Sequence, residues 1–336
     1  MREKSLIDRL GSGTAKVGLL FNPLSGRIRK RKDVMRRMLA TIPGATCREV
    51  TNALEINESV DAFITAGTDL LVIIGGDGTV QGVLCHLFAT QQPAQWPLLA
   101  IVPGGTTNMT ALDLGHSGSP ELILQQLKDS LLKRTSPVLL HRHVLCVEQA
   151  GAAKVYGMFF GVGLIARAVI FSQSRIKQLG ITGEIYSGII TVGYLAGVLF
   201  GFHTGAWAPV QMAIMDRDTE IHRGSFAFLF ASTLDRLLFG MRPYWGQEQE
   251  PLHVTFVRQQ RNPLRSLVQL LSGRGGVLND KNGYHSCNTR ALELLIDDDY
   301  IVDGESYHAG RDNGPVRITL AGPITFLVAS NTSTGS

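Results

Sequence analysis

The sequence predicts an α/β protein: a doubly wound, Rossmann-like parallel-sheet domain, then a mostly β second domain of the sandwich type. In the first 140 or so residues, strand-like runs alternate with helical patterns. Residues 70–74 are all apolar and three of them are β-branched, which indicates a parallel strand buried on both faces. Beyond residue 141 the alternation gives way to shorter β-like runs separated by turn residues, as in all-β domains.

Composition limits the protein class. The 336 residues suggest about two domains. With 44% hydrophobic and 18% charged residues, the chain can bury a full core and is not a disordered polymer. A net charge of +4 suits anionic substrates or an anionic membrane surface and is no nucleic-acid signature. Cys47, Cys85, Cys146 and Cys287 lack metal-ligand spacing and indicate free thiols in a reducing compartment. The polar first 16 residues show no secretory signal.

The first domain is expected over residues 16–138, after a flexible lead at 1–15. Apolar runs predict strands at 17–21, 47–51, 70–74 and 98–102. Helical patterns lie between and after them, at 34–39, 53–66, 80–88, 108–114 and 121–134. Pro137 marks the boundary.

The second domain is expected over residues 139–320. Its candidate strands are 144–147, 154–162, 209–215, 226–232, 253–258, 292–296 and 316–320. We expect the C-terminal segment, 321–336, to be able to return to the first domain.

One stretch, residues 185–215, contains no Asp, Glu, Lys or Arg, and its glycines recur every four residues from Gly193 to Gly205. That length could span a bilayer, and the glycine spacing suits close helix packing in lipid. A span here would split the β domain, however, so we favour a buried or lipid-facing helical insert over 185–208. Plain core packing is the alternative.

The turn Gly75-Gly76-Asp77-Gly78-Thr79 follows the strand 70–74 and opens a helix. Glycines in such a turn let backbone amides approach a phosphate beside the positive end of the helix dipole. Asp77 adds a carboxylate for a magnesium ion or its waters, and Thr79 adds a hydroxyl. The alternative is a tight turn with an Asp N-cap.

Two further turns, at 22–26 and 103–108, follow the strands 17–21 and 98–102. Because the carboxyl ends of parallel strands share one edge of a sheet, we expect the three turns to form one crevice. A basic run follows the first turn: Arg27, Arg29, Lys30, Arg31 and Lys32. It is either a solvated helix start or a phosphate-holding segment, since cations in a first helical turn oppose the helix dipole.

Taken together, these motifs resemble the diacylglycerol kinase catalytic-domain family, which includes bacterial lipid kinases and sphingosine kinases. The turn 75–79 is also shared with NAD kinases, whereas Asn-Pro-x-Ser-Gly at 22–26 points to the lipid branch. The family pattern Pro-x-Gly-Thr-x-Asn matches residues 103–108, and 301–305 looks like the family's Asp-Gly-Glu element. The resemblance covers roughly residues 16–330.

The resemblance implies an ATP-dependent lipid kinase with its active site in a cleft between a nucleotide-binding domain and a β-sandwich domain. ATP and Mg²⁺ are the implied cofactors, with Asp77 as the metal residue and Asp303 as the general base on the lipid hydroxyl. The implied nucleotide-side residues are Asn22, Ser25, Gly26, Arg27, Thr51, Gly75, Gly76, Asp77, Gly78, Thr79, Gly105, Thr106, Thr107, Asn108 and Glu305. We expect a cytoplasmic protein held peripherally at the inner membrane face by its lipid substrate, with no nucleic-acid partner; a homodimer is left open.

The sequence departs from the family pattern where acids are usual. Met109 stands directly after the Asn of the third turn, and Leu139 and Ile165 stand where two further acids are expected. In the second domain, residues 248–252 replace a family Asp-Asp-Gly-Leu element. Fewer carboxylates should weaken magnesium binding. The second hypothesis is therefore a catalytically weak lipid- or nucleotide-binding protein, and the third, less favoured, is an NAD kinase. Locally, Asp303 and Gly304 are also typical of a β-hairpin turn.

Overall fold

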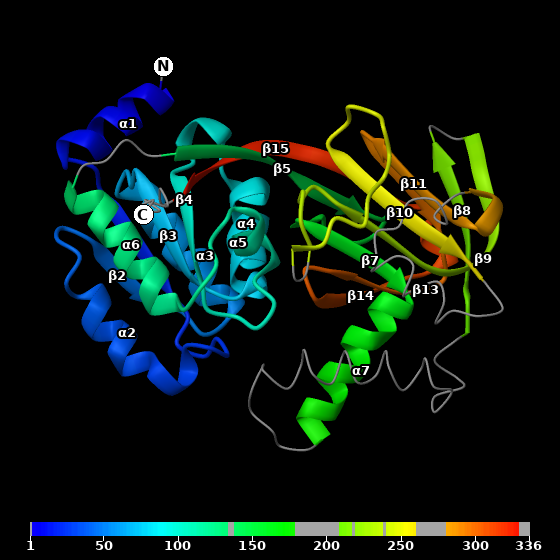
Figure 1. Ribbon diagram of the computed structural model, residues 1–336, viewed down its shortest axis with the longest axis horizontal. Helices are drawn as coiled ribbons and strands as arrows, with labels where there is room; N and C mark the ends of the chain where they lie inside the picture. The colour runs from blue at the N-terminus through cyan, green and yellow to red at the C-terminus, as the bar shows by residue number, and fades with distance from the viewer. Residues whose placement is uncertain are drawn as a thin grey trace, which may run out of the picture. The chain divides into compact units, whose positions relative to one another are not determined.

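The computed structural model describes residues 2–133, 138–178, 208–216, 219–237, 240–259 and 280–328 (Figure 1). The chain forms two compact units: unit 1 runs to Arg142 and resumes at Pro323, and unit 2 runs from His143 to Gly322. Two strands, β5 (Val138–Glu148) and β15 (Val316–Val328), begin in one unit and end in the other. The predicted fold class, an α/β part and a mostly β part, is confirmed.

The sheet of unit 1 contains β1 (Val17–Phe21), β2 (Thr46–Glu49), β3 (Leu70–Gly75) and β4 (Leu98–Pro103). The strands are parallel in the order β4-β3-β1-β2, and the end of β15 pairs with β4 through Phe326 and Leu99. Every residue of β1, β3 and β4 is buried. Parallel strands with such continuous apolar runs need cover on both faces, which the helices supply.

The helices of unit 1 lie on both faces of this sheet (Figure 1). On one face, α1 (Arg2–Ser12), α2 (Lys32–Leu39) and α6 (Pro120–Lys133) bury Leu10, Met35 and Leu124 in a common core with strand residues. On the other, α3 (Ala53–Thr65) packs beside α4 (Asp77–Thr90). The ring of Phe63 on α3 approaches β1 so closely that a Cβ on Gly18 would lie 2.7 Å from it. The short α5 (Met109–Asp113) follows β4.

The N-terminal segment differs from the flexible lead that the sequence predicts. Residues 2–12 form α1, in which Leu6 and Leu10 are buried against the sheet. Arg9 holds the helix in place, since its Nη2 and Nε lie 2.6 and 3.0 Å from the two carboxylate oxygens of Asp69. The only helical pattern in this segment of the sequence is one pair of leucines spaced four apart. So short a pattern does not identify a helix without the sheet that the leucines cover.

Unit 2 is built from antiparallel pairs in the order β14-β13-β7-β9-β8-β12-β15, with β10 between β9 and β11, and β6 beside β5. Its strands besides β5 and β15 are β6 (Val155–Gly157), β7 (Phe159–Gly163), β8 (Val210–Asp216), β9 (Thr219–Ser232), β10 (Leu252–Arg258), β11 (Tyr284–Thr289), β12 (Ala291–Leu295), β13 (Asp298–Val302) and β14 (Glu305–Ala309). Helix α7 (Leu164–Gln178) follows β7. The core lies among large side chains such as Phe160, Phe226, Phe256 and Tyr300.

Helix α7 and strand β11 of unit 2 were not predicted from the sequence. Strands β13 and β14 were expected only as the flanks of the alternative hairpin turn at Asp303 and Gly304. Strands β11 and β14 consist largely of polar residues, so they lack the apolar alternation on which strand prediction depends. Short 3₁₀ segments lie at Arg29–Arg31, Pro93–Gln95, Asp280–Asn282 and Arg311–Asn313.

The apolar insert predicted over 185–208 lies, apart from its last residue, outside the described residues. Among the helices that are described, none has the length and hydrophobicity needed to cross a bilayer. All four cysteines are free thiols, as predicted from their spacing.

Buried histidines make the stability of the fold depend on pH. His116 is 5% exposed, its Nδ1 donates to the carbonyl of Ile101 at 2.9 Å, and its Nε2 has no hydrogen-bond partner among the described residues. Burial lowers the pKa of His116 below its ordinary value of 6.5, so the folded protein binds fewer protons than the unfolded chain. The stability that the fold gains by keeping His116 neutral is therefore complete above about pH 6.5 and is lost as the pH falls below that value.

We expect the unfolding free energy to fall between pH 7.5 and pH 5, by up to about 1.4 kcal/mol per unit of pKa shift. Urea denaturation at both pH values measures it. His116→Gln, which keeps a donor for Ile101, should flatten part of the slope. An unchanged slope in His116→Gln would contradict the assignment. Burial also lowers the pKa of His222 and of His285, so the slope should not vanish entirely.

Candidate functional site

The three turns predicted to share a crevice lie together at the carboxyl edge of β1, β3 and β4, which are neighbours in the sheet. The first and second turns are joined by side chains. Asn22 Nδ2 donates to Thr79 Oγ1 at 2.9 Å, and Ser25 Oγ accepts from the amide of Gly76 at 3.2 Å. Ser25 is buried, so its hydroxyl lies inside the junction between these two turns.

The third turn is tied to the other two by backbone bonds. The amide of Arg27 donates to Gly104 O at 2.9 Å, and the amide of Gly104 donates to Gly75 O at 2.7 Å. Asn108, in the left-handed conformation with φ 48°, accepts from the amide of Gly105 at 2.7 Å and donates to its carbonyl at 2.5 Å. The predicted residues of the three turns therefore form one interlocked structure.

Close backbone packing explains several of the glycines. A Cβ on Gly105 would lie 2.7 Å from the Cα of Gly76, and a Cβ on Gly76 would lie 3.0 Å from the Cα of Gly105. A Cβ on Gly104 would lie 3.2 Å from the carbonyl carbon of Gly75. These positions need glycine for packing alone. Gly78 differs from them, because it is exposed in the first turn of α4.

The first turn of α4 presents backbone donors. The amides of Thr79 and Val80 bond to the carbonyl of Gly76. Within the described part of the chain, the amides of Asp77 and Gly78 have no acceptor. Unpaired amides at the positive end of a 14-residue helix, beside two glycine-containing turns, suit a phosphate group.

The Asp77 side chain is bonded to the third turn, and its predicted role at a magnesium ion stays a prediction. Its Oδ2 accepts from Thr107 Oγ1 at 2.6 Å and from the amide of Met109 at 3.3 Å. The side chain therefore caps the N-terminus of α5 and fixes the third turn. Burial raises the pKa of the Asp77 carboxyl, and these hydrogen bonds oppose the rise.

Both of these hydrogen bonds fall on Oδ2. Asp77 as a residue that holds a magnesium ion or its waters therefore stays a prediction. The described residues contain no group of three or more His, Cys, Asp or Glu side chains arranged to hold a metal. The sequence had left open an Asp N-cap at this position. The structure shows a cap, but on α5 and not on α4.

The remaining predicted residues of unit 1 lie around this junction. Thr106 is partly exposed and Thr107 exposed on the third turn, and Gly26 is partly exposed on the first. Thr51, between β2 and α3, donates through Oγ1 to Glu55 Oε2 at 2.9 Å. Arg27 is exposed and donates to the carbonyl of Gly118 at 3.2 Å.

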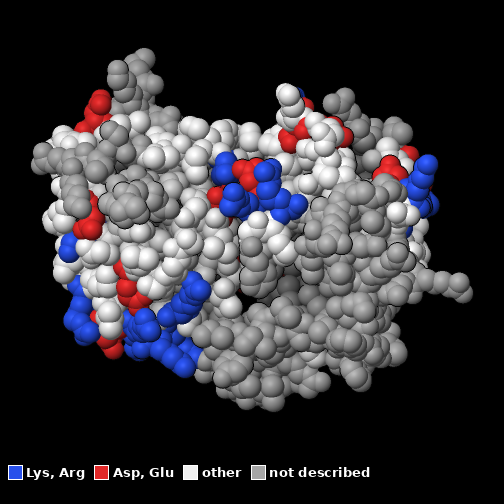
Figure 2. Space-filling model, viewed as in Figure 1, with Lys and Arg blue, Asp and Glu red and all other residues white. Residues whose placement is uncertain are grey.

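The basic run continues the surface of unit 1 beyond the first turn. Figure 2 shows Lys and Arg gathered over the region of α2. The patch consists of Arg27, Arg29, Lys30, Arg31, Lys32, Arg36 and Arg37. Arg31 contacts Glu121 at 3.2 Å, and Arg36 bonds to Asp33 and Glu49. The run is thus a largely solvent-exposed face.

Asp303 and Glu305 belong to unit 2. Asp303 and Gly304, with φ 48° and 93°, form the two-residue turn of the β13–β14 hairpin, as the local alternative predicted. The Asp303 side chain is nevertheless buried and turns back to β7. Its oxygens accept from the amide of Met158 at 3.1 and 2.9 Å and from that of Phe159 at 2.9 Å. Its role as a base stays a prediction, as does the role of the exposed Glu305.

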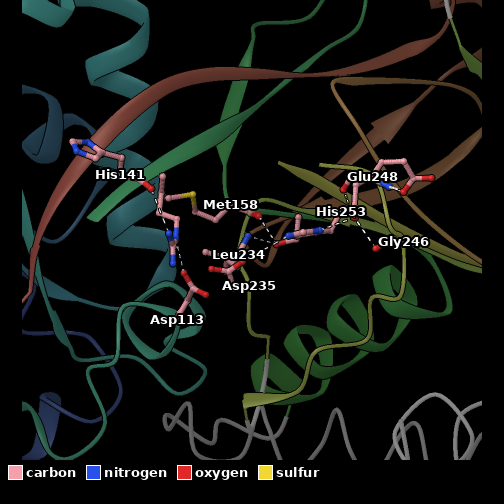
Figure 3. Close-up of polar contacts among 11 residues, drawn as sticks. Asp113, His141, Met158, Leu234, Asp235, Gly246, Glu248 and His253 are labelled. Atoms are coloured by element: carbon pink, nitrogen blue, oxygen red, sulfur yellow. Dashed lines mark hydrogen bonds and ion pairs between the residues drawn. The ribbon is translucent and has the colours of Figure 1, made fainter. Parts of the chain in front are cut away.

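The positions where acids are absent are packing positions. Met109 is 9% exposed, Leu139 packs against the core of unit 1, and Ile165 lies beside Gly161. Asp113, an acid that could have replaced a missing one, is fully buried and accepts from Arg142 Nε at 2.8 Å (Figure 3).

We expect Met109→Asp to destabilise the protein by about 2 kcal/mol or more and not to tighten magnesium binding, because a second carboxylate would be buried near that of Asp77. Met109→Leu, which keeps the apolar volume, is the control. Melting curves and a magnesium titration of activity on both variants test this. Intact stability with tighter metal binding would instead support a missing ligand at 109.

Comparison with known proteins agrees with the motifs. Residues 16–139 match the model of the diacylglycerol kinase catalytic domain. A crystal structure of a proposed diacylglycerol kinase from Bacillus anthracis str. Sterne superposes with a TM-score of 0.67 at 17% identity, over 93% of this chain and 95% of that one. A second structure from that organism, described as a diacylglycerol kinase, gives 0.64 at 16% identity, over 93% and 96%. At these identities the likeness shows the fold.

A curated relative, an uncharacterized protein from Synechocystis sp., is 28% identical over 211 residues. The match covers 55% of this chain and 42% of the relative, so the chain matches less than half of that protein's length.

Proposed function

We propose that this protein is an ATP-dependent lipid kinase that transfers the γ-phosphate to a lipid hydroxyl. Its residues 16–139 match a diacylglycerol kinase catalytic domain. The observation that carries the proposal is that the amides of Asp77 and Gly78, which open α4 at the junction of three turns, have no acceptor among the described residues. Phosphoryl transfer depends mainly on positioning and charge neutralisation, which such donors supply.

In this proposal the turns of unit 1 bind the nucleotide. The amides of Asp77 and Gly78 hold phosphate oxygens, and the Arg27 guanidinium offsets the phosphate charge. Asp303 of unit 2 takes the proton of the lipid hydroxyl. Asp77 acts by holding the third turn, and no step is assigned to a metal bound directly to it.

The alternative is a catalytically weak nucleotide- or lipid-binding protein. It is supported by the Asp77 carboxylate, which is used in capping α5, and by the apolar packing of Met109, Leu139 and Ile165.

Incubation of the purified protein with radiolabelled ATP, magnesium and a mixed lipid extract separates these functions. A labelled lipid supports the kinase, and ATP binding without a labelled product supports the weak or inactive protein. Label on added NAD would overturn both. Parallel reactions with Gly78→Ala show whether any label depends on the α4 turn.

We further propose that the protein acts peripherally at the cytoplasmic face of a membrane, where ATP and the lipid acceptor meet. The exposed basic patch around α2 supports this, since it is suited to anionic lipid surfaces. The protein should sediment with vesicles containing phosphatidylglycerol and be released by high salt. Polar substitutions in 185–208 that left sedimentation unchanged would argue against a lipid-contacting role for that stretch.

A further inference from the structure

Three exposed apolar side chains of unit 1 lie around the basic patch that runs from Arg27 to Arg37. Leu24 of the first turn is 54% exposed, Val34 of α2 is 39% exposed, and Leu122 at the start of α6 is 49% exposed. Single exposed apolar side chains are common on protein surfaces. The informative feature is therefore that these three surround one set of cations.

Leu122 adjoins the patch through its neighbours in sequence. Its Cδ2 would lie 3.1 Å from a Cβ on Gly118, and the carbonyl of Gly118 accepts from Arg27 Nη1 at 3.2 Å. The residue before Leu122 is Glu121, whose Oε1 lies 3.2 Å from Arg31 Nη1. Leu122 therefore lies beside two residues that bind arginines of the patch, and it remains half exposed.

Val34 and Leu24 are presented at the surface by ordered backbone. Val34 lies on α2, one helical turn before Arg37, and both residues are exposed. Leu24 lies in the first turn, where its amide donates to Asn22 Oδ1 at 2.9 Å. Neither apolar side chain is shielded by the element that carries it.

The charge of the patch indicates what covers these side chains. Within the described part of the chain, the Lys and Arg residues of the patch outnumber the acids in contact with them, which are Asp33, Glu49 and Glu121. The gathered cations are visible over α2 (Figure 2). An anionic bilayer matches this face, because it combines negative head groups with an apolar region directly beneath them.

We propose that this face of unit 1 docks on an anionic lipid bilayer, with Leu24, Val34 and Leu122 entering the head-group region between the basic side chains. The inference rests on the proposed location at a membrane and adds an apolar contact to it. It also assigns a lipid contact to unit 1, in addition to any made by residues 185–208. Because Leu24 belongs to the first turn, docking brings the nucleotide-side turns to the bilayer that holds the lipid acceptor.

Vesicle affinity and its dependence on salt separate the apolar contribution from the electrostatic one. With vesicles of phosphatidylcholine and phosphatidylglycerol, Val34→Gln and Leu122→Gln should each lower the affinity about three- to tenfold and leave its salt dependence unchanged. Lys30→Gln should lower both the affinity and the salt dependence. Leu54→Gln is the matched control, because Leu54 is 67% exposed on α3, on the other face of the sheet; it should change neither. Melting curves check that every variant is folded.

A fluorescence measurement tests the same contact directly. Tryptophan favours the interface of a bilayer, so Leu122→Trp should keep or increase the vesicle affinity. Relative to the wild type, its added fluorescence should be quenched by brominated phosphatidylglycerol. The added fluorescence of Leu54→Trp should not be quenched.

Unchanged affinity in both Val34→Gln and Leu122→Gln, with a loss in Lys30→Gln, would overturn the inference and leave a purely electrostatic contact. Equal binding to vesicles of phosphatidylcholine alone would also overturn it. If gel filtration showed that Leu122→Gln turns a dimer into a monomer and its vesicle affinity were unchanged, the face would bind a second copy of the chain instead. Failure of the wild type to bind any vesicle would contradict the proposed location as well, whereas the kinase activity is tested separately by labelled ATP in detergent micelles.

Discussion

Replacing Gly78 with alanine is expected to raise the Michaelis constant for ATP at least about tenfold, or to abolish ATP binding, without loss of stability. Gly78 is exposed in the first turn of α4, and its amide has no acceptor within the described chain. A methyl group there would stand between the backbone and a phosphate. Because alanine is about 0.5–1 kcal/mol better than glycine inside a helix, the melting temperature should stay the same or rise.

Gly76→Ala is the matched variant. Its Cβ would lie 3.0 Å from the Cα of Gly105, so we expect it to lower stability by about 1–3 kcal/mol whatever its effect on ATP. ATP affinity by calorimetry and melting curves on both variants separate the two roles. Unchanged affinity in Gly78→Ala would remove the phosphate role from the α4 turn and leave the glycines with packing roles only.

Asp303→Asn is expected to lower turnover by about 10²- to 10⁴-fold, with ATP affinity within a few-fold of the wild type, because an amide cannot accept the proton of the lipid hydroxyl. The structure indicates that this variant can keep the native fold. Asn tolerates the left-handed conformation at φ 48°, and one oxygen, Oδ1, already accepts from both Met158 and Phe159. The fold should therefore survive the change.

The control is Glu305→Gln, which alters an exposed carboxylate at the start of β14, and it should reduce turnover far less. Single-turnover rates and the melting temperature should be measured for both variants. Near-normal turnover in Asp303→Asn would exclude the base, whereas a large drop in melting temperature would show that its bonds to β7 are its main role.

The sequence was sufficient for features that depend on local signals. Continuous apolar runs at β1, β3 and β4 predicted buried parallel strands, and a shared edge followed from parallel pairing. Helices α1 and α7 and strand β11 were missed. Leu6 and Leu10 of α1, for example, are meaningful only against the sheet that they cover.

The partners of the polar side chains were decided by tertiary structure. Asp77 bonds to Thr107, 30 residues later, and Asp303 bonds to Met158, 145 residues earlier. His253 is oriented by Asn288, 35 residues away.

By itself, the sequence determined the two-part fold and the glycine-containing turns of unit 1, because buried strands and strand-to-helix turns are specified by residues that are close together in the sequence. Tertiary structure alone decided that Asp77 caps α5 and that Asp303 is bound by β7. The physical reason is that a carboxylate takes whichever donors the packed backbone brings within about 3 Å, and sequence spacing does not encode that distance.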